Sequence, residues 1–209
     1  MGGIRRGRTS DGIKTRPWGL VVLGVWFVVC LGVVGSLMVG HWVSLPVPNA
    51  AAAQRLETLG ASPPGAKRPW LVVHALYGKC TCSQRIFESL VSTTRPRGVR
   101  EILLLADAAP TWRAQAHAAG LEIRGLTAPE LKERYGIEAA PLFMVFDPQG
   151  RLVHTGGYTE RKQGLAIVDR AIVEALMAEP NAPRPPLPVF GCGVSRQLQQ
   201  LLDPLGIKS

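Results

Sequence analysis

The feature that most constrains this chain is a stretch near its N-terminus without a charged side chain. No Asp, Glu, Lys or Arg occurs at residues 17–54, and residues 18–39 have the sequence WGLVVLGVWFVVCLGVVGSLMV. A helix of about 20 apolar residues spans the roughly 30 Å hydrocarbon core of a bilayer. Such a helix needs no hydrophobic periodicity, because every face of it meets lipid. The sequence therefore predicts one transmembrane helix within residues 18–43.

The residues on either side of this span predict its orientation. Residues 1–17 contain five basic residues and one acidic residue, and the cytoplasmic flanks of membrane helices are rich in Lys and Arg. Trp18 and Trp42 lie near the two ends, where indole rings prefer the membrane interface. We therefore expect a single-pass protein of a bacterial inner membrane, with a cytoplasmic leader at residues 1–17 and the main domain in the periplasm.

A cleaved signal peptide is the alternative to an anchor. Residues 49–53 include small side chains that suit a signal peptidase, but the apolar run is longer than the roughly 7–15 residues usual in signal peptides. Both interpretations send the rest of the chain out of the cytoplasm. Residues 44–68, which contain several prolines and an Ala-rich stretch, are interpreted as a tether.

Between residues 69 and 178, segments with strand and helix patterns alternate. Continuous apolar runs such as residues 70–76 are typical of strands buried on both faces. The expected strands are residues 70–76, 101–106, 121–126, 141–147 and 151–155, and the expected helices are residues 83–93, 110–119, 128–135 and 164–178. This order favours a mostly parallel sheet with helices on both faces, to which the last hairpin adds antiparallel strands. The predicted fold class is α/β, with a central mixed sheet.

The charge distribution argues against nucleic-acid binding. The formal net charge is +9, but outside the leader the basic residues are dispersed along the chain. A nucleic-acid interface needs basic residues gathered on one face. We therefore expect no nucleic-acid partner.

Two cysteines one residue apart, Cys80 and Cys82, lie between a predicted strand and a predicted helix. In open α/β sheets, ligands and chemistry gather at such junctions. A helix N-terminus favours a thiolate, and the neighbouring Lys79 acts in the same direction. A thiolate attacks a disulfide, and a second thiol then resolves the mixed disulfide. We assign Cys80 as nucleophile and Cys82 as resolving thiol, and a capping box at residues 81–84 would leave this order open.

Other interpretations of the cysteines stay open. Structural disulfides are common outside the cytoplasm, so Cys192 is a possible partner for either Cys80 or Cys82. These thiols together with His154 also form a candidate copper or zinc site. His154 itself is interpreted as a solvated or hydrogen-bonded imidazole, and His74, inside an apolar strand, as a hydrogen-bonded core residue.

The segments around the cysteines and around Pro141 resemble a known family. Residues 70–90 (WLVVHALYGKCTCSQRIFESL) are similar to the active-site strand, loop and helix of thioredoxin-like proteins, and residues 135–152 (YGIEAAPLFMVFDPQGRL) to their cis-proline segment and hairpin. The resemblance covers about residues 69–178. It implies a thioredoxin-like fold in which Pro141 is cis and faces the cysteines. It also implies that Ala140 and Pro141 hold an extended partner chain.

The element order and the anchor most resemble TlpA-type thiol–disulfide oxidoreductases, and a RedB-type subset that carries C-x-C is more similar still. Residues 156–161 (GGYTER) and 188–192 (PVFGC) resemble segments of that subset. The chain departs from the usual pattern, because C-x-x-C is absent, Lys79 replaces the preceding tryptophan, and Ala140 precedes Pro141. The direction of electron flow and the substrate therefore do not carry over.

The resemblance implies a membrane-anchored, extracytoplasmic thiol–disulfide oxidoreductase. Its partners would be cysteine-containing proteins outside the cytoplasm, and it would need neither a cofactor nor a metal. Two alternatives use the same fold differently. One is a copper-binding assembly chaperone, and the other is a binding subunit without catalytic activity.

Residues 179–209 are predicted to be a Pro-rich extension that contains Cys192. An extended chain gains roughly 3 Å per residue, so residues 180–189 are long enough to cross a domain of this size. Phe190 supplies an apolar anchor, and the glycines on both sides of Cys192 allow the backbone to turn closely around the thiol. We therefore expect the tail to fold back over residues 69–178. Cys192 would then be a second resolving thiol, a partner for another chain, or a small buried residue.

Overall fold

The computed structural model describes residues 17–42, 44–60, 67–162, 164–180, 182 and 184–203. The chain divides into two compact units, Met1–Val39 and Gly40–Ser209. The predicted cytoplasmic leader lies outside the described residues except for Pro17, and so does the 61–66 part of the predicted tether.

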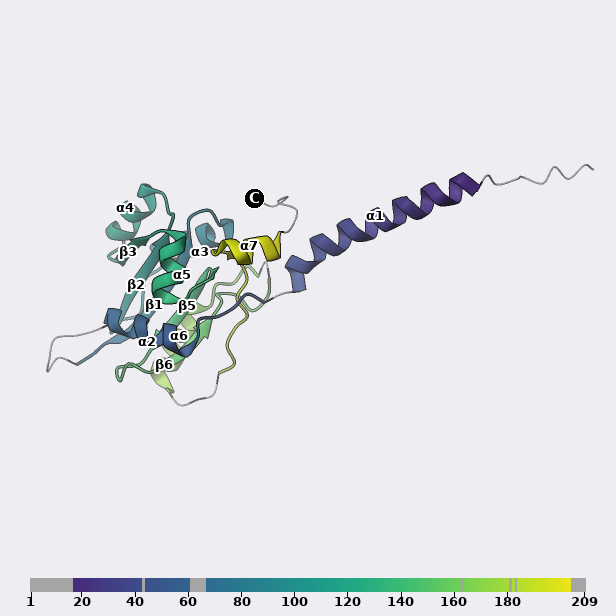
Figure 1. Cartoon of the computed structure of the whole chain (residues 1–209). Helices are drawn as coiled ribbons and strands as arrows, with labels where there is room; N and C mark the ends of the chain where they lie inside the picture. The colour runs from purple at the N-terminus through teal and green to yellow at the C-terminus, as the bar shows by residue number, and fades with distance from the viewer. Residues whose placement is uncertain are drawn as a thin grey trace, which may run out of the picture. The chain divides into compact units, whose positions relative to one another are not determined.

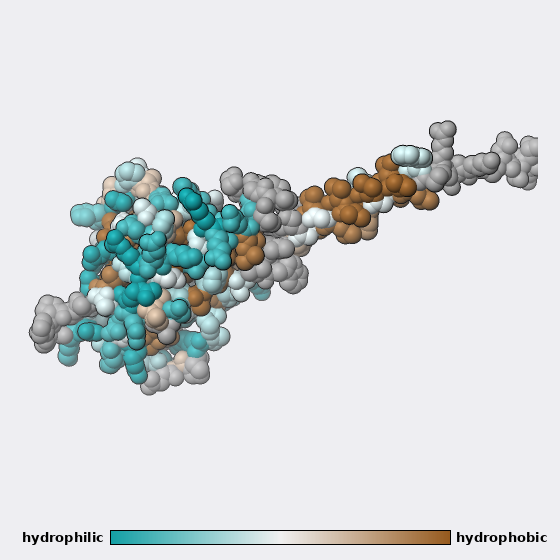
Figure 2. Space-filling model, viewed as in Figure 1, coloured by the Kyte–Doolittle hydropathy of each residue, from teal (hydrophilic) through white to brown (hydrophobic). Residues whose placement is uncertain are grey.

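The first unit is dominated by helix α1, Pro17–Trp42. Its segment Trp18–Gly35 has a mean hydropathy of 2.4, and none of that segment is buried. The large apolar side chains of α1 between Trp18 and Val34 are exposed (Figure 2), with Trp18 at 76%. Among the described residues, α1 is the one helix long and apolar enough to cross a membrane. A membrane anchor and a signal sequence both satisfy this description.

The second unit is built on a five-stranded mixed sheet of order β3-β2-β1-β5-β6 (Figure 1). Its strands are β1 (Trp70–Tyr77), β2 (Val99–Ala106), β3 (Glu122–Leu126), β5 (Leu142–Phe146) and β6 (Leu152–Gly156). β1, β2 and β3 are parallel, whereas β5 runs antiparallel to both β1 and β6. The first three strands are linked by helices and the last two by a hairpin, as predicted. The α/β, thioredoxin-like fold class is thus confirmed.

The helices of this unit are α2 (Ala50–Glu57), α3 (Thr81–Ser92), α4 (Pro110–Ala118), α5 (Ala128–Tyr135), α6 (Asp169–Ala178) and α7 (Arg196–Leu202), with a 3-10 turn, η1, at Thr58–Gly60. Two short strands, β4 (Ala139–Ala140) and β7 (Cys192–Gly193), pair outside the main sheet. Helix α5 has the predicted bounds because Thr127 and Glu130 form a capping box and Gly136 ends it in the left-handed conformation. Helix α6 begins at Asp169, later than the predicted residue 164.

The strands are apolar throughout because both faces of the sheet are covered. Successive residues of β1 belong to different core clusters: Val73 packs in one and Val72 in the other. We call the first the tail face, because C-terminal residues such as Val189, Val194 and Leu198 pack against it. We call the second the network face, for the buried polar residues described below.

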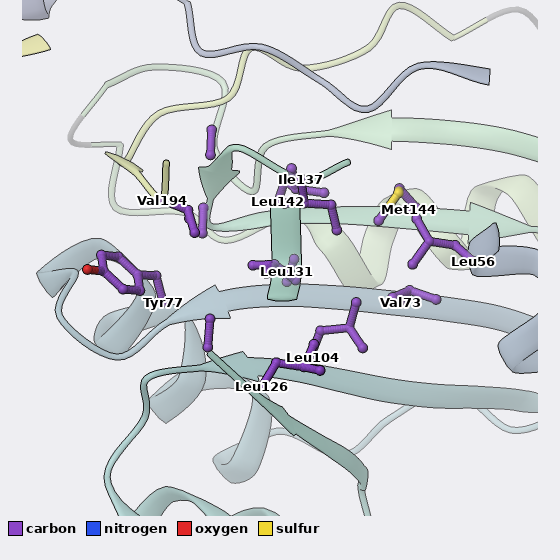
Figure 3. Close-up of a cluster of buried hydrophobic side chains, with 14 of the residues drawn as sticks. Leu56, Val73, Tyr77, Leu104, Leu126, Leu131, Ile137, Leu142, Met144 and Val194 are labelled. Carbon is purple, nitrogen blue, oxygen red and sulfur yellow. The ribbon is translucent and has the colours of Figure 1, made fainter. Parts of the chain in front are cut away.

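The tail face is covered by helices α2 and α5 and by the C-terminal extension. Figure 3 shows Leu56 of α2 beside the strand residues Val73 and Met144, with Leu131 of α5 in the middle of the cluster and Val194 of the tail toward its other end. Leu56 has no solvent-exposed surface. The prediction of a tether is therefore wrong for α2, since burial of its apolar side ties this segment to the domain core.

The network face is covered by helices α3, α4 and α6. Phe87 of α3 stacks on Trp112 of α4 with ring centroids 4.4 Å apart. Val173 and Leu176 of α6 and Ala116 of α4 complete this cluster, and all three are buried. The segments that cover the tail face and the network face thus enclose the sheet between them.

A chain of buried polar side chains crosses the network face. His74 Nδ1 lies 2.7 Å from the Tyr158 hydroxyl, and His74 Nε2 lies 3.3 Å from Glu101 Oε2. Arg95 donates to Glu101 at 2.8 Å and to Asp169 at 2.7 Å. Burial by itself would raise the pKa of Glu101, but His74 and Arg95 outweigh it and lower that pKa. The prediction that His74 is a hydrogen-bonded core residue is confirmed.

Candidate active site

The candidate site is at the C-terminal end of β1, where the chain turns into α3. Cys80 is the N-cap residue of α3, with an extended backbone, and its amide donates to the Tyr77 carbonyl at 3.0 Å. The Cys80 carbonyl then accepts the first helical bond, from Gln84, at 3.0 Å. The capping box suggested for residues 81–84 is wrong, because the helix begins at Thr81 and Cys80 occupies the cap without a side-chain capping bond.

The two cysteines of the C-x-C motif differ in exposure. Cys80 is 2% exposed and belongs to the core cluster of the tail face, whereas Cys82, in the first turn of α3, is exposed. None of the four cysteines, which all lie within the described residues, forms a disulfide. Cys30 lies in α1, in the other unit of the chain. Of the two thiols in the motif, Cys82 is therefore the one that solvent reaches.

Pro141 lies beside Cys80. The Ala140–Pro141 peptide bond is cis, and the Cys80 thiol donates to the Ala140 carbonyl with sulfur and oxygen 3.8 Å apart. The two features implied by the thioredoxin-like resemblance, a cis Pro141 and its closeness to the cysteines, are both confirmed. Ala140 and Pro141 come from a loop about sixty positions along the chain from Cys80, so only the tertiary fold brings them together.

The C-terminal extension reaches the same place. Strand β7 pairs antiparallel with β4, with Cys192 opposite Ala140 and Gly193 opposite Ala139. The amide of Val194 donates to the Glu138 carbonyl at 2.7 Å. The prediction that the tail folds back over the domain is thereby confirmed, and Cys192 is placed at the carbonyl that Cys80 also contacts.

Three thiols thus form one cluster, with Cys80 between the other two. The hydrogen bond with Cys192 is the main cause that raises the pKa of Cys80, and burial adds to it. The same bond lowers the pKa of Cys192. The pKa of Cys82 is raised far above its ordinary value by its hydrogen bond with Cys80 and by burial. The most acidic thiol of the cluster is therefore Cys192.

This electrostatic result corrects the prediction for Cys80. The helix N-terminus does contribute, because the backbone of Ser83 lowers the pKa of Cys80. That contribution is smaller than those of the Cys192 hydrogen bond and of burial. Lys79 is exposed beside the motif and is not among the causes of the shift. The expected acidification of Cys80 by its neighbours is thus outweighed by its place under the tail.

The histidine proposed for a metal site lies on the other face of the sheet. His154 is 6% exposed, and its ring lies 4.9 Å from that of Phe143, a residue of the network face. The interpretation of His154 as a solvated or hydrogen-bonded imidazole is wrong for solvation, since the side chain is buried, and its Nε2 has no hydrogen-bond partner among the described residues. Burial lowers the pKa of His154. Among the described residues, no group of three or more His, Cys, Asp or Glu side chains is arranged to hold a metal ion.

Comparison with known proteins gives only distant similarities. No protein-family model and no curated protein matches the chain. A hypothetical protein from Sinorhizobium meliloti 1021 is 18% identical, with 74% of this chain and 91% of that one covered and a TM-score of 0.48. An uncharacterized conserved protein from Geobacillus kaustophilus is also 18% identical, with 61% and 77% covered and a TM-score of 0.48.

A third similar structure is the thioredoxin domain of a thiol–disulfide oxidoreductase from Bacteroides vulgatus. It is 17% identical, covers 43% of this chain and 70% of its own, and has a TM-score of 0.34. These similarities are too weak to transfer an activity. The sheet order and the cis-proline define a thioredoxin-like domain, and its chemistry has to be argued from its own three thiols.

Proposed function

We propose that this protein is a membrane-anchored thiol–disulfide oxidoreductase that acts on cysteines of proteins outside the cytoplasm. One observation carries the proposal: the Cys80 thiol donates to the carbonyl that precedes the cis Pro141, and Cys82 is exposed in the first turn of the helix that Cys80 caps. Thiol–disulfide exchange needs one thiolate that attacks and a second thiol within reach that resolves. The C-x-C motif supplies both at an exposed helix start.

Exposure and pKa favour opposite orders of attack for the two thiols of the motif, because Cys82 is the exposed thiol but its pKa is raised far above its ordinary value. Cys82 is exposed and meets the partner first, whereas Cys80 is 2% exposed and lies behind it. In either order, one thiolate of the pair attacks the partner disulfide and forms a mixed disulfide, and one partner thiolate leaves. The other thiolate of the pair then attacks the sulfur of the mixed disulfide that belongs to this protein, so that a Cys80–Cys82 disulfide forms and the second partner thiolate is released. Two electrons pass to the partner.

Anchoring and orientation are part of the same proposal. The uncharged helix α1 has the length and composition of a membrane span, and the basic residues before it favour a cytoplasmic N-terminus. Residues 44–209 would then lie in the periplasm, where disulfides persist. A reporter that is active only in the periplasm, fused after Ser209, is expected to be active. Activity of a cytoplasmic reporter at the same junction would contradict this orientation.

The redox test uses the full-length protein in detergent. After equilibration in glutathione buffers of stepped potential, alkylation and mass spectrometry measure the oxidised fraction of the peptide that carries Cys80 and Cys82. We expect a reversible two-electron transition, in which a tenfold change in the ratio of oxidised to reduced protein corresponds to about 30 mV. The transition should vanish in Cys80→Ser and persist in the control Cys30→Ser. A wild-type protein without any reversible transition would exclude the oxidoreductase.

A further inference from the structure

We propose that Cys192 is a third redox residue of this site. It attacks Cys80 in the Cys80–Cys82 disulfide, and the Cys80–Cys192 disulfide that forms holds the C-terminal strand in place beside Pro141. This inference rests on the proposed oxidoreductase activity, which it deepens by adding a step inside the protein. Four features of the structure lead to it: the place of strand β7, its fit, the position of Cys80 between two thiols, and the chemistry of exchange.

Strand β7 occupies the backbone edge next to the cis-proline. Cys192 is opposite Ala140 in the β4–β7 pair, and the next amide, that of Val194, donates to Glu138. An extended chain from another protein that paired with β4 would need the same backbone groups. The protein's own tail therefore fills the place that the thioredoxin-like resemblance assigned to a partner chain, and it carries a cysteine at that place.

The tail is fitted closely to this path. A side chain at Gly191 would collide with the Ala140 carbonyl oxygen, and one at Gly157 with the Pro188 carbonyl oxygen. Main chain thus lies against main chain at two positions where only glycine leaves room. Val189, which precedes β7 in the chain, is held as well, because its carbonyl accepts a hydrogen bond from the Leu45 amide at 3.2 Å.

The end of the tail is held as well. Ser195 donates its hydroxyl to Glu138 at 2.7 Å and caps helix α7 by accepting from the Leu198 amide. Gln199 of α7 donates to the Gly193 carbonyl at 3.0 Å. Both sides of Cys192 are therefore anchored, so its thiol stays near Cys80 without any disulfide.

The position of Cys80 between two thiols favours exchange between two disulfides. Cys80 caps the helix whose first turn carries Cys82, and its thiol contacts the carbonyl of Ala140, the residue that lies opposite Cys192. A disulfide between residues i and i+2 closes a small, strained ring, and strain makes a disulfide easier to reduce. A disulfide between Cys80 and Cys192 closes no small strained ring, because the two residues are far apart in the chain and are brought together by strand pairing.

The step balances as thiolate exchange. The Cys192 thiolate attacks the Cys80 sulfur of the Cys80–Cys82 disulfide, the Cys80–Cys192 bond forms, the Cys80–Cys82 bond breaks, and the leaving Cys82 thiolate takes up a proton. No electrons are gained or lost by the protein in this step, since the partner disulfide was the oxidant in the preceding one. Cys192 is suited to attack because strand pairing holds it opposite Ala140, whose carbonyl the Cys80 thiol contacts. Cys82 is returned to the reduced form, exposed at the surface.

The test starts from the full-length protein with Cys30→Ser, in which three thiols remain, and removes one of these three thiols at a time. Each protein is oxidised with glutathione disulfide, and its disulfides are mapped by mass spectrometry without reduction. We expect Cys82→Ser to form an intramolecular Cys80–Cys192 bond and to retain a reversible two-electron transition. Cys192→Ser should form only the Cys80–Cys82 bond, with its transition at a higher potential because that ring is strained.

A fourth variant, Gly191→Ala, keeps all three thiols and displaces the tail. We expect a severalfold loss of the Cys80–Cys192 product and faster alkylation of Cys80 in the folded protein, with far-ultraviolet circular dichroism to verify the fold. If Cys82→Ser instead gives Cys80 bound to glutathione and a free Cys192, the third redox residue is excluded while the Cys80–Cys82 activity stands. If wild-type protein shows no transition at all, the proposed function fails and this inference with it.

Discussion

The two faces of the sheet are both covered by apolar side chains but are held together by different means. On the network face, a buried set of charged and hydrogen-bonded side chains, centred on Arg95 and Glu101, joins β1 and β2 to α6. On the tail face, segments from the two ends of the domain, α2 and the C-terminal extension, pack onto α5 and the strands. Two thiols of the candidate site, Cys80 and Cys192, pack on the tail face.

This difference separates stability from chemistry. A buried charged network has one arrangement in which every group is paired, so it is rigid and costly to disturb. The tail is held by a few backbone bonds and glycine contacts, which can be made and broken locally. The network face thus holds the strands rigidly, whereas on the tail face a segment can change its contacts when a disulfide forms.

The largest expected effect comes from the network face. Arg95→Met would leave the carboxylates of Glu101 and Asp169 buried without their cation, and removing one partner of a buried ion pair costs about 3–5 kcal/mol. Unfolding by urea, followed by circular dichroism, measures the loss. The matched control is Arg100→Met in β2, whose bidentate pair with Glu122 is about one-third exposed and is worth about 1 kcal/mol or less. Equal losses in the free energy of unfolding would contradict the expected difference between the buried and the exposed ion pair.

A smaller loss is expected on the tail face from Leu56→Ala. The Leu56 side chain has no exposed surface, and such truncations cost about 2–5 kcal/mol, with the lower part of that range expected for a short helix that can settle inward. The control is Leu165→Ala, because Leu165 is 88% exposed. A loss no larger than that of the control would show that α2 is a tether after all. The redox transition should keep its potential in Leu56→Ala.

The smallest effect is the pH dependence of Cys192. Its pKa is lowered by the hydrogen bond with Cys80, which favours the Cys192 thiolate. Cys80→Ala removes this donor, so the pKa of Cys192 should rise and the midpoint of its alkylation should move to higher pH. A thiol is a weak donor, which keeps the shift modest. Alkylation rates at the Cys192 peptide across a pH series measure it, with Cys30→Ala as control, and an unmoved or lowered midpoint would refute the assignment.

The sequence by itself determined the local elements and their order. Continuous apolar runs predicted β1 and β2, the helical spacing of apolar residues predicted α3, and Thr127 with Glu130 and Gly136 set the ends of α5. These signals work because strand and helix periodicity and capping act between residues a few positions apart. The resemblance at Pro141 added the cis bond and its closeness to the cysteines.

Only the tertiary structure decided which of these parts meet. The burial of α2, the pairing of Cys192 with Ala140, and the contact of His74 with Tyr158 all join residues far apart in the chain. The roles of Cys80 and Cys82 depend on the same contacts, because it is the returning tail and the Pro141 loop that bury one thiol and leave its neighbour exposed. Exposure and pKa are properties of a residue's surroundings in space, and a linear pattern records only its neighbours in the chain.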